Sequence, residues 1–298
     1  MNENILFSII IPTYNRGSLL KRCLDSVLAQ TYQNWEAIIV DNYSEDDTEA
    51  IVKAYSDPRI IYIKNHNYGI ISVSRNKALD LCKGDWVAFL DSDDSWCPSK
   101  LAVMRKYCGE YDLIYHGFRM GMPRRYLFQN LNNYFYEIKE SRLGYMIERG
   151  DAISPSCSCI SRAFIGDSRF EERADFRAVE DYDFFLQIID KGPRIKYLRQ
   201  ALTIYDMSGC SHGDDVLERE LHILQKWADK LTEQEKQEFL MNIDIRKAWY
   251  LRSIHDYSGA RASFKKVMKS HIFKKRWNAM IEYIKCYLLD FCHYFKSN

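Results

Sequence analysis

Three carboxylates, those of Asp91, Asp93 and Asp94, follow the five apolar residues 86–90 (WVAFL). Residues i and i+2 of a strand point to the same side, so Asp91 and Asp93 are expected to converge at its end. Converging carboxylates repel each other unless a cation lies between them, and a hard divalent ion prefers such oxygen ligands. A surface turn is also commonly built from Asp and Ser. The cluster by itself therefore indicates a metal site and a plain turn equally well.

Polar residues also follow two other apolar runs. The segment 12–15 (PTYN) follows the run 6–11, and the segment 41–42 (DN) follows the run 35–40. In open α/β sheets, ligands bind in the crevice beyond the carboxyl ends of the strands. Three polar clusters at strand ends therefore favour a ligand-binding edge over three unrelated surface turns.

Short apolar runs alternate with helix-like segments over the first hundred residues, which is the pattern of a mostly parallel sheet. The expected strands are residues 6–11, 35–40, 60–63 and 86–90. The expected helices, from apolar periodicity and cap residues, are 19–28, 44–55 and 72–82. No G-x-G-x-x-G follows the first strand and no G-x-x-x-x-G-K-[ST] occurs, which excludes a dinucleotide-binding fingerprint and a P-loop.

The composition is that of an ordinary globular protein. The chain has 298 residues and a net charge of +1, with 47% hydrophobic residues, and gives no overall bias towards nucleic acid. The nine cysteines form no C-x-x-C pair, and Cys157 and Cys159 are the closest together, which favours a reducing cytosol over a zinc site or a disulfide framework. No apolar run approaches the roughly 20 residues that span a bilayer. Residues 1–4 lack a basic n-region, so we expect no signal peptide.

Four motifs, in this order, resemble those of family 2 glycosyltransferases with the GT-A fold. They are IIIPTYNR at 9–16, IVDNYS at 39–44, SRN at 74–76 and DSDD at 91–94. Members of that family are inverting enzymes that use nucleotide sugars. The resemblance implies an α/β GT-A fold: a Rossmann-like, mostly parallel sheet with flanking helices, plus a C-terminal helical extension. The chain departs from the family's frequent Asp, Gly and Ala at Asn42, Tyr43 and Ser74.

The resemblance also implies roles for the residues of these motifs. Substrate binding would fall to Pro12, Thr13, Tyr14, Arg16, Asp41, Asn42, Arg75, Asn76, Asp91 and Ser92. Asp41 would accept a hydrogen bond from the uracil N3–H, and Arg75 would contact the donor phosphate or sugar, since its forked donors suit anionic oxygens. Asp93, with Asp91 close by, would hold Mn²⁺ or Mg²⁺ on the diphosphate, whereas Asp94 would fix the turn.

A second acidic cluster, Glu180, Asp181 and Asp183, comes at the start of a segment whose apolar residues define a helix face within 184–189. Acidic residues at a helix N-terminus complement the helix dipole, which is one explanation of the cluster. The cluster also resembles the Glu-Asp motif of the family, whose Asp serves as the catalytic base. That resemblance implies that Asp181 is the base, and that Glu180 and Asp183 either position the acceptor or cap the helix.

The middle of the chain is expected to contain two more strands, at 113–118 and 154–160. The resemblance suggests that the second of them lies near the acceptor. Segment 126–136 is aromatic and rich in Asn, and is either an acceptor-facing insertion or a surface loop. In segment 208–213 (SGCSHG), His212 is a candidate ligand of the metal or the diphosphate, and a loop histidine without a role fits equally well.

Helical periodicity dominates from residue 216 and includes a hairpin within 246–264 that is centred on 257–259. An apolar, aromatic helix is expected over 277–295. Just before it lies a basic cluster, made of Lys265, Lys266, Lys269, Lys274, Lys275 and Arg276. A basic segment beside such a helix suits an anionic membrane surface. A helix packed on the catalytic domain with a solvated basic edge would also fit.

These features predict a metal-dependent, inverting glycosyltransferase with a catalytic domain at 1–215 and a helical region at 216–298. The nucleotide sugar would bind to the half at 1–100 and the acceptor to the half at 101–215. The motifs resemble enzymes of bacterial O-antigen and surface-polysaccharide assembly. That resemblance implies transfer of a hexose, Gal or Glc, from a UDP-sugar to an undecaprenyl-diphosphate-linked acceptor in β linkage.

Such an enzyme would be cytoplasmic, peripheral on the inner face of the cytoplasmic membrane, and without a nucleic-acid partner. Three alternatives stay open at this point. One is transfer of a sugar to polyprenyl phosphate, and another is a nucleotidyltransferase, which would release pyrophosphate instead of UDP. The third is a degenerate binding protein, against which the intact Asp41, Asp93 and Asp181 argue.

Overall fold

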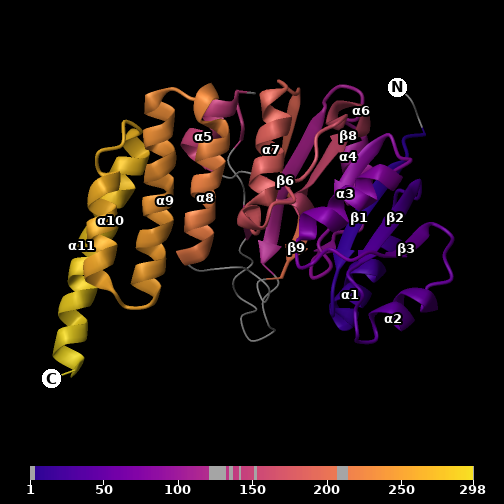
Figure 1. Ribbon diagram of the computed structural model, residues 1–298, viewed down its shortest axis with the longest axis horizontal. Coiled ribbons are helices and arrows are strands. Elements are labelled where there is room, and N and C mark those ends of the chain that lie inside the picture. The colour runs from indigo at the N-terminus through magenta and orange to yellow at the C-terminus, as the bar shows by residue number, and fades with distance from the viewer. Residues whose placement is uncertain are drawn as a thin grey trace. The chain divides into compact units, whose positions relative to one another are not determined.

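The computed structural model describes residues 4–120, 132–133, 137–140, 142–150, 153–206 and 214–297 (Figure 1). The chain divides into two compact units. The sheet unit comprises Met1–Ser141 and Ala152–Cys210, and the helical unit comprises Arg142–Asp151 and Ser211–Asn298. A short internal segment therefore belongs with the C-terminal helices. The division of the chain into donor and acceptor halves stays a prediction.

One sheet contains nine strands of the described residues, in the order β3-β2-β1-β4-β8-β6-β9-β5, with β7 paired to β6. The strands are β1 (Phe7–Thr13), β2 (Trp35–Asp41), β3 (Ile60–Lys64), β4 (Trp86–Phe89), β5 (Ser95–Trp96), β6 (Leu113–Met120), β7 (Asn132–Asn133), β8 (Ser158–Ser161) and β9 (Ile195–Tyr205). Strands β1 to β4 are parallel, whereas β8 runs antiparallel to β4 and β6. The α/β, GT-A type of fold that the motifs implied is thus confirmed.

The helices of the sheet unit place apolar side chains against the strands. They are α1 (Gly17–Leu28), α2 (Thr48–Ala54), α3 (Ile71–Leu81), α4 (Lys100–Arg105), α6 (Arg162–Ile165) and α7 (Glu180–Asp190). In α1, Leu20, Cys23, Leu24 and Val27 recur at helical spacing and lie in the core. β1 and β2 are buried along their whole length, which explains why both read as uninterrupted apolar runs.

The strand expected at 154–160 is wrong in its first half. Residues Pro155–Cys157 form a 3₁₀ turn, and β8 begins only at Ser158. Proline has no backbone N–H to donate to a strand ladder, so the chain cannot pair regularly there. Segments 126–131, 134–136 and 208–213, including His212, lie outside the described residues.

The helical unit is built from α5 (Leu143–Arg149), α8 (Asp214–Trp227), α9 (Glu233–Ser253), α10 (Tyr257–Val267) and α11 (Phe273–Ser297). α9 begins with a capping box, in which the Thr232 hydroxyl accepts from Glu235 N–H and the Glu235 carboxylate accepts from Thr232 N–H. α10 packs against both α9 and α11 (Figure 1). Among the described helices, none is both long enough and apolar enough to cross a bilayer.

The helical hairpin is confirmed, but its turn lies earlier than expected. α9 ends at Ser253 and α10 begins at Tyr257, so the chain turns over residues 254–256. The Asp256 carboxylate accepts a hydrogen bond from Gly259 N–H at 2.9 Å and caps α10. Gly259 is therefore the residue that the cap needs inside the first turn, since a Cβ there would meet Asp256 Oδ2 at 2.4 Å.

Candidate active site

The carboxyl ends of β1, β2 and β4 lie side by side on one edge of the sheet. Thr13 pairs in register with Asp41, and Ile10 pairs with Phe89 on the other side of β1. Since Asp91 follows β4 by two residues, it emerges close to the end of β1. The three polar clusters therefore share one edge, as the order of strands and motifs predicted.

Asp41 is fully buried and is held by uncharged donors. Its carboxylate accepts from the Ser44 N–H and hydroxyl, and its Oδ2 accepts from the Tyr62 hydroxyl at 2.6 Å. The donors come from the loop after β2 and from β3, so both neighbouring elements fix the same carboxylate. This arrangement orients Asp41 without neutralising its charge.

Two of the departures from the family pattern are joined by one hydrogen-bonded chain. Asn42 Oδ1 accepts from the Asn67 N–H at 2.8 Å, and the Asn67 amide donates to the Ser74 hydroxyl at 2.9 Å. Asn42 and Ser74 thus support each other through a residue that belongs to neither motif. The sequence contains no local signal for this link, because the three residues are spread over 33 positions.

The third departure, Tyr43, stands at a backbone position that favours glycine. Its φ is 57°, in the left-handed region that costs a side chain about 1 kcal/mol or more. The Tyr43 ring stacks on the His66 ring, with centroids 3.8 Å apart and an interplanar angle of 12°. This stacking offsets part of the backbone cost and keeps Tyr43 at the edge of the site, where it is half exposed.

The acidic turn after β4 is held by arginines. Asp94 N–H donates to the Asp91 carbonyl at 2.9 Å and closes the turn. Asp93 forms an ion pair with Arg16, which follows β1, and its backbone carbonyl accepts from Arg22 on α1. Arg22 had no expected role in the sequence, since it lies on a helix and outside the four motifs.

The carboxylates of this turn are crowded. Asp94 is buried, and its Oδ1 accepts from the Asp206 N–H at 2.9 Å, at the end of β9. Burial and the nearby Asp91 charge raise the pKa of Asp94 to about 8. Burial and Asp91 also raise the pKa of Asp93 above its usual range, against the lowering effect of Arg16. The turn therefore holds negative charge that is costly to keep ionised, and an added cation would relieve that cost.

The acidic turn fits a divalent ion that is shared with a ligand. Among the described residues, no group of three or more His, Cys, Asp or Glu side chains is arranged to hold a metal alone. Mg²⁺ is commonly held by one or two carboxylates together with substrate phosphates. Asp91 and Asp93 offer that donor set, and Arg16 would have to share Asp93 with the ion. The expected metal role of His212 stays a prediction, because that residue lies outside the described parts.

Arg75 joins the acidic turn to the start of α7. It is 3% exposed, and its two terminal nitrogens donate to Asp91 Oδ1 and to Glu180 Oε1, each at 2.8 Å. Burial alone would lower the pKa of Arg75, but Asp91, Glu180 and Asp181 together raise it. A contact between Arg75 and a donor phosphate stays a prediction. The structure adds a bridge between segments 105 residues apart.

Asn76 holds the chain that leads to α7. Its side-chain amide donates to the Phe170 carbonyl at 2.9 Å and to Glu172 at 2.8 Å, and its Oδ1 accepts from the Phe170 N–H at 2.9 Å. Further along, Ala178 takes a φ of 67° and turns the chain into α7. Asn76 thus fixes the segment that leads to α7, and Arg75 fixes the first residue of α7.

The three acidic residues in the first turn of α7 have different surroundings. Glu180 is buried against Arg75, and Asp183 is fully buried and accepts from the Gln187 amide at 2.9 Å. Asp181 is only half buried, and its Oδ1 accepts from the Tyr182 N–H at 2.8 Å. Of the three, Asp181 is therefore the carboxylate that keeps access to the outside while lying close to the Arg75 charge.

A support that the sequence did not indicate lies behind the acidic turn. The Ser156 hydroxyl accepts from the Asp91 N–H at 3.0 Å. The Ser156 carbonyl accepts from Lys100 Nζ at 2.6 Å, from Trp96 Nε1 at 3.0 Å and from the Thr203 hydroxyl at 2.7 Å. Lys100 is fully buried, which lowers its pKa to about 7. Side chains from α4, β5 and β9 therefore hold Ser156 in place, and Ser156 in turn holds the start of the acidic turn.

The remaining predicted residues at the edge are split between buried and exposed. Thr13 is 5% exposed, and its hydroxyl has no hydrogen-bond partner within the described residues. Pro12 and Ser92 are buried, whereas Tyr14 is 50% exposed. The edge thus combines a buried floor with the accessible aromatic rings of Tyr14 and Tyr43, which is suited to a ligand that has a flat ring.

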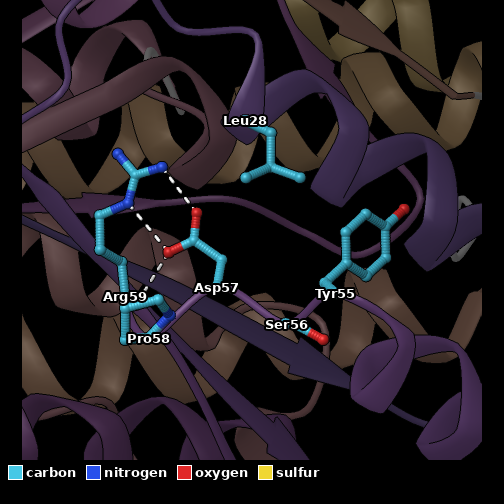
Figure 2. A pocket seen from close by; sticks show the side chains of 6 residues that line it. All are labelled: Leu28, Tyr55, Ser56, Asp57, Pro58 and Arg59. Carbon is cyan, nitrogen blue, oxygen red and sulfur yellow. Dashed lines mark hydrogen bonds and ion pairs between the residues drawn. The ribbon is translucent and has the colours of Figure 1, made fainter.

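A pocket of about 470 Å³ lies away from this edge (Figure 2). It is lined by Leu28, Tyr55, Ser56, Asp57, Pro58 and Arg59, before the amino end of β3. Arg59 already pairs with Asp57 at 2.7 Å and stacks over Trp35 at 3.8 Å. Its charged groups are thus satisfied within the protein, and it shares no residue with the acidic turn.

A family model described as "Glycosyl transferase family 2" matches residues 8–165. This range covers more than half of the chain and includes β1 to β4 with the acidic turn. α7, which carries Asp181, lies beyond the matched range.

Two curated relatives come from Escherichia coli. The chain is 42% identical over 121 residues to "Putative colanic acid biosynthesis glycosyl transferase WcaA", a match that covers 40% of this chain and 42% of WcaA. It is 31% identical over 206 residues to "UDP-Glc:alpha-D-GlcNAc-diphosphoundecaprenol beta-1,3-glucosyltransferase WfaP", which covers 67% of this chain and 76% of WfaP. The chain thus spans less than half the length of WcaA and about three quarters of WfaP.

Two solved structures share the fold. TarS 1–349 of S. aureus in complex with UDP has a TM-score of 0.62 and 21% identity, covering 98% of this chain and 92% of that one. The mannosyltransferase PcManGT from Pyrobaculum calidifontis, in complex with GDP-Man and Mn²⁺, has a TM-score of 0.57 and 16% identity, covering 95% and 80%. At these identities the likeness shows the fold alone.

Proposed function

The chain belongs to glycosyl transferase family 2, and on that premise we propose that it transfers a hexose from a UDP-sugar to a sugar hydroxyl with inversion at the anomeric carbon. The observation that carries this proposal is the Arg75 bridge from Asp91 to Glu180. A transferase of this kind has to bring the diphosphate of the donor close to the catalytic base that deprotonates the acceptor hydroxyl. Arg75 joins the element that carries the acidic turn to the helix that carries Asp181.

The nucleoside of the donor would bind at the ends of β1 and β2. Asp41 would accept from the uracil N3–H, because its carboxylate is already oriented by Ser44 and Tyr62. The exposed ring of Tyr14 would contact the nucleoside at this edge, and the buried Thr13 hydroxyl would supply a further hydrogen bond. That TarS, which shares the fold, binds UDP supports a uridine nucleotide here.

The diphosphate and the sugar would lie over the acidic turn. Asp91 and Asp93 would hold Mn²⁺ or Mg²⁺, and Arg16 and Arg75 would add positive charge around it. When bound, the ion would neutralise the charge that develops on the leaving diphosphate without needing a proton. The Mn²⁺ in the PcManGT complex supports a metal in this fold. The donor site would be completed by Ser92 in the acidic turn and by Asn42 and Asn76. Asn42 fixes the backbone at Asn67, and Asn76 fixes the backbone at Phe170.

The acceptor hydroxyl would be activated by Asp181. As the hydroxyl oxygen bonds to the anomeric carbon, the carbon–oxygen bond to UDP breaks and the hydroxyl proton passes to the Asp181 carboxylate. The products are the new glycoside, UDP and a protonated Asp181, which returns its proton to water. The partial exposure of Asp181 supports this role, since Glu180 and Asp183 are buried by their own partners.

The acceptor would be a sugar on undecaprenyl diphosphate in bacterial surface-polysaccharide synthesis. The activity for which WfaP is named, glucosyl transfer from UDP-Glc to GlcNAc-diphosphoundecaprenol in β-1,3 linkage, supports both the acceptor class and a UDP-hexose donor. Gal and Glc are the favoured sugars. A lipid-linked acceptor would keep the enzyme on the cytoplasmic face of the inner membrane as a peripheral protein.

A donor screen tests the proposal. UDP-Glc, UDP-Gal, UDP-GlcNAc and UDP-GalNAc are each incubated with the protein, Mn²⁺ or Mg²⁺, and a short-chain analogue of GlcNAc-diphosphoundecaprenol. We expect acceptor-dependent release of UDP with one hexose donor, and a β-anomeric proton in the product by NMR. Release of pyrophosphate would indicate a nucleotidyltransferase, and transfer to polyprenyl phosphate alone would indicate a different acceptor.

A further inference from the structure

One side of the C-terminal helix α11 is packed within the helical unit. Ala279 and Cys286 are buried, and Tyr283 lies between them in sequence and is partly buried. These three residues recur at i, i+4 and i+7, so they share one face of the helix. This face contacts α10 and contributes to the small core of the helical unit, together with Phe264.

The opposite side of α11 is apolar and exposed. At about 100° per residue, the positions 277, 284 and 288 lie within about 40° of one another and roughly opposite the packed face. The exposed fractions are 51% for Trp277, 51% for Ile284 and 62% for Leu288. Tyr287 is 58% exposed but lies nearer the packed face, where its ring contacts Arg261 of α10 at 4.5 Å and Tyr283 of α11. Large apolar side chains that are exposed over about 17 Å of one helix are typical of a surface that binds another molecule or a membrane.

Basic residues lie next to this exposed face. Lys274 and Lys285 are separated by eleven positions, as are Trp277 and Leu288, so the two lines run parallel about 60° apart on the helix. Segment 265–277 contains six Lys and Arg residues and no acidic residue, and two of the six, Lys266 and Lys275, form ion pairs with Asp244 and Glu238 of α9. Lys265, Lys269 and Lys274 are exposed and form no ion pair within the described residues.

We propose that the outward face of α11, defined by Trp277, Ile284 and Leu288, attaches the protein to an anionic lipid bilayer. The helix would lie in the plane of the surface, with its apolar side chains among the acyl chains and Lys274 and Lys285 at the headgroups. This inference rests on the proposed function in one respect, since a lipid-linked acceptor makes such attachment useful.

Charge decides between a bilayer and a second copy of the chain. In a symmetric pair with parallel helices, the basic segment 265–277 of each copy would approach the same segment of the other, and like charges across an interface are unfavourable. In an antiparallel pair the segment would approach residues 289–297 of the other copy, a stretch whose sequence contains one acidic residue to pair with it. An anionic surface instead attracts these residues, and Trp and Tyr are common at the level of the headgroups. The surface chemistry therefore fits a bilayer better than self-association.

Co-sedimentation with vesicles tests this attachment. The full chain is mixed with vesicles of phosphatidylcholine alone or of phosphatidylcholine with phosphatidylglycerol, at low and high salt. We expect at least about tenfold stronger binding to the anionic vesicles, weakened by salt. The Ile284→Ser/Leu288→Ser variant should bind at least about tenfold more weakly. The matched control is Ile254→Ser, since Ile254 is 54% exposed at the end of α9 and should leave binding unchanged.

Three results would overturn the attachment. They are absence of binding to anionic vesicles, equal binding by the double variant, and a dimer by light scattering that the double variant converts to a monomer. Circular dichroism checks that both variants keep their helices. Transfer to a water-soluble acceptor without vesicles should be unchanged in the double variant. Failure of that transfer in the unmodified chain would contradict the proposed function and leave vesicle binding as an independent result.

Discussion

Two acidic sites lie on the same edge of the sheet, and the protein stabilises them in different ways. Asp41 accepts from Ser44 and Tyr62, which are uncharged donors. Asp91 and Asp93 instead pair with the guanidinium groups of Arg75 and Arg16. The first carboxylate is fixed in place, whereas the second pair belongs to a charge network that an incoming cation can rearrange.

The difference teaches which role each site suits. A carboxylate that is fixed by neutral hydrogen bonds is a suitable acceptor for one defined N–H of a ligand. A crowded set of carboxylates, with the pKa of Asp93 and Asp94 raised, is suited to binding a cation and a charged ligand together. The edge thus has a recognition end at β2 and an electrostatic end at β4.

Arg75→Leu should show the largest effect, because it removes the centre of the charged site. Asp91 and Glu180 would lose their shared partner inside the protein, at a cost of about 3–5 kcal/mol in the free energy of unfolding. Urea unfolding measures this cost. Arg75→Lys keeps the charge but not the fork and should lose less. A loss below about 1 kcal/mol for Arg75→Leu would show that the bridge is not structural.

Asp93→Asn and Asp41→Asn should separate the two ends of the edge. Asp93→Asn should weaken UDP binding about tenfold or more in the presence of Mn²⁺ and little in its absence. Asp41→Asn should weaken UDP binding with and without the ion, because it removes the acceptor for uracil. Calorimetric titration with Mn²⁺ or with EDTA measures both. If Mn²⁺ changes the UDP affinity of both variants equally, the two ends of the edge do not have separate roles.

The pH dependence of stability should come from the charged end. The pKa of Asp94 is about 8 in the folded protein, above its ordinary value near 4. Between these values the folded state holds a proton that the unfolded state has lost, so the free energy of unfolding should fall as pH rises from about 4 to about 8. Asp94→Asn, measured without divalent ions, should flatten this slope. An unchanged slope of the free energy of unfolding against pH would show that a group other than Asp94 causes the pH dependence.

Tyr62→Phe should show the smallest effect. It removes one of the donors to Asp41, and the Ser44 donors stay, so we expect a loss of about 1 kcal/mol in the free energy of unfolding. The pH slope of the Asp94 region should be unaffected. Thermal and urea unfolding of this variant at two pH values measure both quantities. A loss in the free energy of unfolding as large as that of Arg75→Leu would mean that neutral hydrogen bonds stabilise the β2 end as strongly as ion pairs stabilise the β4 end.

The sequence predicted those parts of the structure that depend on the residue pattern of a single strand or helix. The strands β1 to β4 were predicted because β1, β2 and β4 are buried apolar runs and β3 is a partly buried one. The polar segments that follow β1, β2 and β4 had to share an edge once the strands were parallel. β9 was not predicted, because Lys196 and Arg199 interrupt its apolar pattern and it pairs with β6 through an irregular register. Residues Pro155–Cys157 continue the alternation of small and apolar residues that predicts a strand, but Pro155 has no N–H for the ladder and the segment forms a 3₁₀ turn.

The partners of the site residues could not be predicted, since they depend on the folded chain. Asp91, Arg75 and Asp181 were singled out by type and motif, but nothing in the sequence pairs Arg75 with Glu180. The same is true of Ser156, whose carbonyl accepts from Lys100, since a lysine in an amphipathic segment gives no sign of being buried. Whether each residue performs its expected role stays a prediction that the variants test.

The turnover of Asp181→Asn tests the central claim most directly. Asparagine keeps the size of the side chain and cannot take the proton of the acceptor hydroxyl, so acceptor-dependent release of UDP should fall by about 10²–10⁴ in kcat. The affinity for UDP should stay within about twofold, because Asp181 lies on the α7 side of the Arg75 bridge and not in the acidic turn. Near-normal turnover in this variant would contradict the account, since no other carboxylate of α7 is both partly exposed and close to the Arg75 charge.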